Sequence, residues 1–167
     1  MTDAAIDRLL AIEAIKQVKY AYCRCLDQKL WDEMAVLLHP EAVASYSGGK
    51  YHYEGRDAII DFMSRNMGRD GFHSSHRVHH PEVEFESPTR ARVVWALDDV
   101  NVDTEYAIYL TGAAFYDDVY VLDGDAWVIL ETRYKRTFET LRPLSGTDIS
   151  VTASWWSTDG RSQLDVQ

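Results

Sequence analysis

The stretch HSSHRVHHPEVEFESPTRARVVWALDDVNV, residues 73–102, decides the fold class of this 167-residue chain. Apolar and polar residues alternate on both sides of Ser87-Pro88, and a period of two is typical of β-strands. Serine and proline favour a turn between the two runs. The stretch therefore predicts two long antiparallel strands joined by a turn.

The residues that follow continue this pattern. EYAIYLTGAAFYDDVYVLDGDAWVILETRYKRTFETL, residues 105–141, predicts two more long strands joined by a turn at Asp123-Gly124-Asp125. From Pro143 the chain is polar and irregular apart from Trp155-Trp156. We therefore divide it into a domain of residues 1–142 and a C-terminal arm of residues 143–167, which could pack on a neighbouring subunit.

Helical periodicity dominates the residues before Gly71. A second short helix from Trp31 is expected to end at His39-Pro40, and residues 56–67 predict a third. Between them AVASYSGGKYHYEG, residues 42–55, predicts a β-hairpin. The first and longest helix, of about six turns, is predicted by apolar residues at helical spacing, namely Ile6, Leu9, Leu10, Ile12, Ile15, Val18, Tyr22 and Leu26.

Helices followed by long antiparallel strands predict one α+β domain with its helices on one face of the sheet. Glycine and proline inside long strands allow a sheet to curl. We therefore expect a strongly curved, antiparallel or mixed sheet. The N-terminal helices would close this sheet into a cone with an internal apolar pocket.

Composition excludes several classes of protein. The formal net charge is −10, so a nucleic-acid partner, which needs a basic face, is not expected. No apolar run is long enough to span a membrane, and the N-terminus MTDAAIDRLL lacks the pattern of a signal peptide. We expect a cytoplasmic protein without a membrane partner. Cys23 and Cys25 lie two positions apart on a helix, so they cannot form a disulfide with each other.

Polar residues at buried positions are the candidates for a functional site. In WALDDV, alternation places Asp99 on the strand face with the larger apolar side chains and Asp98 on the opposite face. Asp99 is therefore the carboxylate expected inside. A buried carboxylate needs a partner, and a nearby histidine would serve.

Tyr22 and Asp27 stand late on the first predicted helix. The macrodipole disfavours a carboxylate at a helix C-terminus, so Asp27 either serves a site or is a solvated loop acid. Among the clustered histidines, His76 shares a strand face with Val78, whereas His79 points away. Their spacing matches neither HExxH nor a Cys/His zinc pattern, so we expect one functional histidine and no metal.

A tyrosine, two carboxylates and a histidine could thus meet in one apolar cavity. A His–Asp pair makes a general base, because the carboxylate orients the imidazole and stabilises its charged form. A phenol can donate to a carbonyl oxygen. The chain has no GxGxxG, Walker or GxSxG motif, so proton transfer is the chemistry favoured. A simpler alternative is that the four are buried polar residues that satisfy one another.

The sequence resembles the SnoaL-like branch of the NTF2-like superfamily, from about Ile12 to Glu139. The resemblance is strongest to bile-acid 7α-dehydratases and more distant to scytalone dehydratases and a dehydrochlorinase. It implies a helix-capped cone, no cofactor, and a homo-oligomer, a dimer or a trimer. The motifs that carry it are YCRCLD, WDEM, SYSGGK, HSSHRVHHPEVEF, WALDD, GAAFYDD and ETRYKRTFE.

The resemblance also implies roles for individual residues. Tyr46 is expected to bind substrate. Arg133 stands where the family pattern has a small residue, so we expect it at the mouth of the pocket, where it would affect substrate size. The residues to which the resemblance gives catalytic roles are Tyr22, Asp27, His76 and Asp99.

Residues and resemblance together predict a cofactor-independent dehydratase, a lyase acting on a small hydrophobic ring-bearing substrate, a polycyclic or aromatic-like hydroxy-ketone. His76 would be the base, Asp27 would orient it, and Tyr22 would donate to the carbonyl oxygen. Asp99 would assist the leaving hydroxyl or hold the histidine. An isomerase or cyclase would use the same pocket. A non-catalytic small subunit, like the β-subunit of ring-hydroxylating dioxygenases, is a further alternative.

Overall fold

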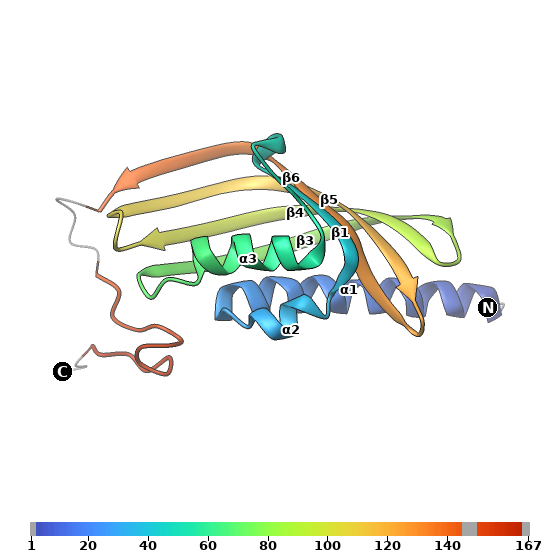
Figure 1. The fold of residues 1–167 in the computed structure, drawn as a ribbon, viewed down its shortest axis with the longest axis horizontal. Helices are drawn as coiled ribbons and strands as arrows, with labels where there is room; N and C mark the ends of the chain where they lie inside the picture. Colours follow the sequence, from blue (N-terminus) through green and yellow to red (C-terminus); the bar gives the residue numbers. More distant parts are fainter. Residues whose placement is uncertain (1–2, 145–149, 165–167) are drawn as a thin grey trace.

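The computed structural model describes residues 3–144 and 150–164. Over these residues a sheet of six strands is covered on one face by three α-helices (Figure 1). In chain order the elements are α1 (Asp3–Gln28), α2 (Trp31–Ala35), β1 (Leu38–Tyr46), a 3₁₀ turn (Ser47–Gly49), β2 (Tyr51–Glu54), α3 (Arg56–Met67), β3 (Phe72–Ser87), β4 (Arg90–Asp103), β5 (Ile108–Asp123) and β6 (Ala126–Pro143).

The sheet is curved and mixed, with the strand order β2-β1-β6-β5-β4-β3 (Figure 1). Strands β3 to β6 form an antiparallel meander, which confirms the four long strands that alternation predicted. Strands β1 and β2 form the predicted hairpin. β1 also pairs with β6 in parallel, so the earliest strand lies beside the latest. The α+β class, with helices on one face of the sheet, is confirmed.

The second helix is shorter than the sequence predicted. α2 ends at Ala35, and Leu38 begins strand β1 where a helix end at His39-Pro40 was expected. The amide of Ile129 in β6 donates to the carbonyl of Leu37 at 2.9 Å, and Leu38 pairs with Ile129 in the parallel ladder. Pairing with a distant strand therefore overrides the local helical pattern.

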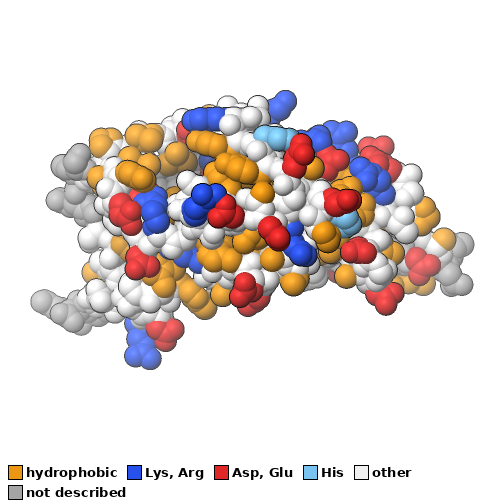
Figure 2. Space-filling model, viewed as in Figure 1, with side chains coloured by type: hydrophobic (Ala, Val, Ile, Leu, Met, Phe, Trp, Pro, Cys, Tyr) orange, Lys and Arg blue, Asp and Glu red, His pale blue; other side chains and the backbone are white. Residues whose placement is uncertain are grey.

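The hydrophobic core lies between the helices and the sheet. On the face viewed in Figure 2, acidic and basic side chains are interspersed among apolar ones. Within the described residues, no helix combines the length and the apolar character needed to cross a membrane. The largest fully buried apolar and aromatic side chains are Trp95, Tyr22, Tyr120, Ile15, Met34, Leu38, Ile59 and Ile129.

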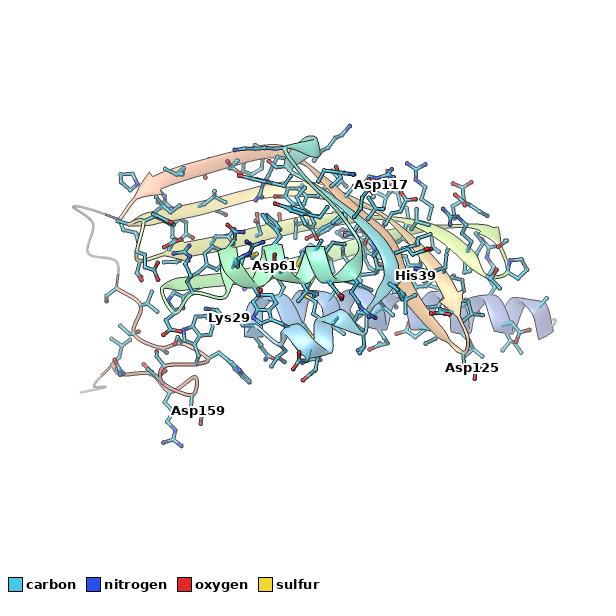
Figure 3. All side chains as sticks on the ribbon, viewed as in Figure 1. Lys29, His39, Asp61, Asp117, Asp125 and Asp159 are labelled. Carbon is cyan, nitrogen blue, oxygen red and sulfur yellow. The ribbon has the colours of Figure 1, made fainter. Side chains whose placement is uncertain are left out.

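The described part of the C-terminal arm, residues 150–164, folds back onto its own chain (Figure 1). The Trp156 indole donates from Nε1 to the carbonyl of Asp70 at 2.9 Å, and its ring stacks on His73 with 4.9 Å between centroids. The Lys29 ammonium lies 3.4 Å from the centre of the same ring, and Figure 3 shows Lys29 beside the arm. The rest of the arm lies outside the described residues, and its packing on a neighbouring subunit stays a prediction.

Docking of the arm is expected to weaken as the pH falls. Burial lowers the pKa of His73, the Lys29 ammonium lowers it further, and the Asp103 carboxylate opposes them. The stacked indole of Trp156 contributes to this burial, so docking favours neutral His73. The docked state is therefore expected to be most stable above the ordinary histidine pKa of about 6.5 and to lose stability as the pH falls below it.

The measurement is the fluorescence of Trp156, taken as the difference between wild type and Trp156→Phe, from about pH 8 to pH 5. A His73→Phe variant keeps a ring for the indole to stack on and serves as the control. Its docking is expected to lose the pH dependence. The same pH dependence in this variant would show that another group titrates.

Candidate active site

A cavity of about 180 Å³ lies between α1, α3 and the sheet. Aromatic and apolar side chains form most of its wall, and a few polar side chains interrupt them. Four of the six predicted site residues line it, whereas Asp27 and Arg133 do not. The lining residues are Tyr22, Leu26, Tyr46, Tyr51, Phe62, Met63, Met67, Phe72, His76, Asp99, Asn101, Tyr116, Tyr134 and Arg136.

Asp27 and His76 form a hydrogen-bonded pair between the end of α1 and strand β3. His76 Nδ1 lies 2.7 Å from Asp27 Oδ1, and the His76 amide donates to Oδ2 at 2.8 Å. The Ser74 hydroxyl donates to Oδ1, also at 2.8 Å. Three donors from one strand hold the carboxylate at this unfavourable helix end. Asp27 is therefore tied into the sheet and is not a freely solvated loop acid.

This pair leaves one imidazole nitrogen available to the cavity. In the neutral imidazole with Nδ1 as the donor to the carboxylate, Nε2 is the acceptor nitrogen, and no atom of the described residues hydrogen-bonds to it. His76 lines the cavity with 8% of its side chain exposed, and Asp27 lies behind it. A neutral imidazole held in this way can accept a proton from a ligand in the cavity.

Tyrosines form one wall of the cavity. The hydroxyl oxygens of Tyr22 and Tyr46 lie 3.1 Å apart, within hydrogen-bond distance. Tyr116 packs edge-on against Tyr22, with 6.4 Å between ring centroids. Burial raises the pKa of Tyr22, Tyr46 and Tyr116 above the ordinary value. These phenols are therefore protonated at neutral pH and act as hydrogen-bond donors.

Asp99 faces the cavity and lies directly opposite His76 in the β3–β4 ladder, but its carboxylate is hydrogen-bonded to other residues. The residue is 3% exposed, whereas Asp98 on the other face is exposed, as the alternation predicted. Both terminal nitrogens of Arg136 donate to the Asp99 carboxylate, with Nη2 2.7 Å from Oδ2. Asn101 donates to the same Oδ2 at 3.0 Å. The expectation that Asp99 would hold the histidine therefore differs from the structure, in which an arginine and an amide occupy its oxygens.

Arg136, and not Arg133, is the arginine of the cavity. Arg133 has 49% of its side chain exposed and forms an ion pair with Glu131. The expectation that it lies at the mouth of the pocket is therefore wrong. Alternation along β6 gives the reason, because Tyr134 and Arg136 point to the cavity while Arg133 points away. The same alternation that distinguishes Asp99 from Asp98 on β4 therefore distinguishes Arg136 from Arg133 on β6.

Loss of the Arg136 side chain is expected to destabilise the protein, whereas loss of Arg133 is not. Arg136→Met leaves the buried Asp99 carboxylate with Asn101 alone, so the free energy of unfolding should fall by about 1–3 kcal/mol. Arg133→Met removes an exposed ion pair and serves as the matched control. Urea unfolding of the two variants measures the difference. Equal losses would contradict the assignment of Arg136 to the cavity.

Comparison with known proteins agrees with this architecture. A model of the SnoaL-like domain matches residues 7–133. A candidate scytalone dehydratase from Novosphingobium aromaticivorans has a TM-score of 0.75 and 22% identity, with 95% of this chain and 99% of that chain covered. The hexachlorocyclohexane dehydrochlorinase LinA-type3 from Novosphingobium barchaimii has a TM-score of 0.76 and 18% identity, with coverages of 88% and 99%. A candidate aromatic ring hydroxylase from Novosphingobium aromaticivorans has a TM-score of 0.71 and 19% identity, with coverages of 83% and 94%.

At these identities the solved structures show a shared fold and nothing of the reaction. The greater similarity to bile-acid 7α-dehydratases stays a prediction. The match to the family model, in contrast, extends from the first helix to the last strand and includes the Asp27–His76 pair. The chain therefore belongs to the SnoaL-like domain family of the NTF2-like superfamily.

Proposed function

We propose that this protein is a lyase that eliminates water from a ring-bearing hydroxy-ketone by acid–base catalysis. The observation that carries the proposal is the Asp27–His76 hydrogen bond, which orients an imidazole on the wall of an aromatic cavity. The names of two structural neighbours, a candidate scytalone dehydratase and a dehydrochlorinase, denote eliminations and support the same class of reaction.

In this mechanism His76 Nε2 removes a proton from the carbon next to the ketone. The electron pair of that C–H bond forms an enolate, whose oxygen accepts a hydrogen bond from Tyr22 or Tyr46. Asp27 stabilises the imidazolium through Nδ1. The imidazolium then gives its proton to the β-hydroxyl, the C–O bond breaks, and water leaves. A conjugated ketone remains, and the enzyme neither gains nor loses a proton.

Asp99 and Arg136 have a different role in this proposal. They form a charge-paired polar patch on the cavity wall, together with Asn101. Because the carboxylate already accepts hydrogen bonds from both neighbours, it is a poor candidate for transferring the proton of the leaving group. We propose that the patch orients polar substituents of the substrate.

The size of the cavity favours a substrate of one or two rings. An engineered protein cavity of about 150 Å³ is large enough for benzene. The cavity described above has a volume of about 180 Å³ and a largely aromatic wall, which suits a small planar ring system. A four-ring steroid would leave much of its surface outside. The proposed substrate is therefore a monocyclic or bicyclic hydroxy-ketone.

The test is a product scan with purified protein and no added metal or cofactor. The panel contains monocyclic and bicyclic β-hydroxy-ketones and hydroxylated 3-oxo steroids. Loss of water, seen by mass spectrometry together with a new enone absorbance band, is expected for the smaller substrates. A product with the mass of its substrate would favour an isomerase or cyclase. Turnover of steroids alone would contradict the size argument, and an inert panel would favour a non-catalytic subunit.

A further inference from the structure

A buried ion pair lies behind the tyrosine wall of the cavity. Lys19 on α1 and Asp118 on β5 have no exposed side-chain surface, and Lys19 Nζ lies 2.8 Å from Asp118 Oδ2. Tyr120 donates its hydroxyl to the same oxygen at 2.9 Å. Neither member of the pair lines the cavity, so neither touches a ligand there. The pair is also separate from Asp27–His76.

The Lys19 ammonium packs on the faces of two cavity tyrosines. Nζ lies 3.2 Å from the ring centroid of Tyr116 and 4.7 Å from that of Tyr22. Although Nζ is within ion-pair distance of Asp118, it is in hydrogen-bond geometry with no atom of the described residues. The ammonium therefore lies between one carboxylate oxygen and the electron-rich ring faces, an arrangement that favours particular ring planes.

An ion pair is an energetically costly choice of side chains for a fully buried space between α1 and β5. Removing two charges from water is costly, and well-packed apolar side chains of similar volume often serve a fold equally well. What an apolar filling cannot supply is a directed contact with the two ring faces. Asp118 holds Lys19, and Lys19 contacts the rings of Tyr22 and Tyr116, two residues that line the cavity.

We propose that Lys19, held by Asp118, is a positioning residue that fixes where the hydroxyl groups of Tyr22 and Tyr116 lie in the cavity. Through Tyr22 the effect extends to Tyr46, whose hydroxyl lies within hydrogen-bond distance. The catalytic consequence rests on the proposed function. The positioning itself can be measured without any reaction.

The first experiment uses the double variant Lys19→Met/Asp118→Asn. It removes both charges, shortens the side chain at residue 19 by only one heavy atom, keeps the shape of residue 118 and leaves an acceptor for Tyr120. Protein labelled with 3-fluorotyrosine is studied by fluorine NMR, and single Tyr→Phe variants assign the resonances of Tyr22 and Tyr116. In wild type each is expected to give one narrow resonance.

In the folded double variant both resonances are expected to broaden or split, while that of the exposed Tyr106 stays unchanged. Asp118→Glu, which keeps both charges but moves the carboxylate by one methylene, should show the same signature to a smaller degree, and it replaces the double variant if the latter folds poorly. Narrow, single resonances for Tyr22 and Tyr116 in a folded variant would overturn the proposal.

The second experiment measures turnover of a substrate identified by the product scan. The double variant is expected to lower kcat by about 10- to 100-fold, because small misplacements of catalytic groups have effects of this size. In a Tyr22→Phe/Tyr116→Phe background the same change should have little further effect, since the hydroxyl groups it positions are absent. A full additional loss in that background would overturn the positioning role. An inert wild type would count against the proposed reaction and leave the fluorine result to decide this inference.

Discussion

Replacement of His76 by alanine is expected to lower turnover by about 10²- to 10⁴-fold, the usual contribution of a general base. The fold should tolerate the change. Asp27 would lose the imidazole but would keep the hydroxyl of Ser74 and the backbone amide of residue 76. The carboxylate would therefore remain partnered, and the thermal midpoint should change little. The measurement is kcat and KM on a bicyclic hydroxy-ketone that the wild type dehydrates, together with calorimetry.

His79→Ala is the matched control for this experiment. His79 lies three residues along the same strand, is 40% exposed and has its own carboxylate partner, Asp98. It does not line the cavity, so its loss should leave kcat unchanged. Asp27→Asn should reproduce most of the His76→Ala loss, because the orienting charge disappears. Undiminished turnover in His76→Ala would refute the mechanism and leave only the fold-level conclusion.

The single variant Lys19→Met is expected to lower the free energy of unfolding by about 3–5 kcal/mol, the cost of leaving one charge of a buried pair without its partner. Asp118 would remain fully buried, with the hydroxyl of Tyr120 as its remaining donor. A loss of this size is a large fraction of the stability of an ordinary domain. Urea unfolding, followed by circular dichroism, measures it.

Two further variants test whether the loss of stability comes from the unpaired buried charge. Lys19→Met/Asp118→Asn removes the uncompensated charge and should recover most of the lost stability. Lys16→Met, one turn earlier on α1, removes a partly exposed lysine that pairs with Glu13, and should change stability by less than about 1 kcal/mol. If the double variant were no more stable than Lys19→Met, the loss would come from packing and not from the buried charge.

Strand alternation was the most informative signal in the sequence. It placed Asp99 inside and Asp98 outside, and the structure has them so. The rule works here because β4 pairs with β5 without a register shift, and the shifts in its pairing with β3 lie away from Asp98 and Asp99. On β6 the resemblance singles out Arg133, whereas alternation along the strand points Arg136 inward.

Two other features could not be read from any local pattern. Lys19 lies on the first helix among polar and apolar neighbours, and a lysine is almost never fully buried unless it is paired. Its partner, Asp118, stands on a strand about a hundred residues later, as the sequence numbering shows. The strand at Leu38 likewise depends on Ile129. These contacts join residues far apart in the sequence and form only when the chain folds. Helix caps, turns and hydrophobic periodicities, in contrast, can be recognised in short segments of the sequence.

The parallel pairing of β1 with β6 has a consequence for how the protein is made. On the ribosome, Val43 and Ser45 emerge long before Glu131 and Arg133, the residues beside which they finally lie. Until then β1 has only β2 as a strand partner within the described sheet, and a two-stranded hairpin is marginal in water. The nascent chain therefore cannot complete its sheet from the N-terminus, and folding must wait for contacts of high sequence separation, which form slowly. A chain cut before β6 would hold Tyr46 on an unsupported strand and would never enclose a cavity.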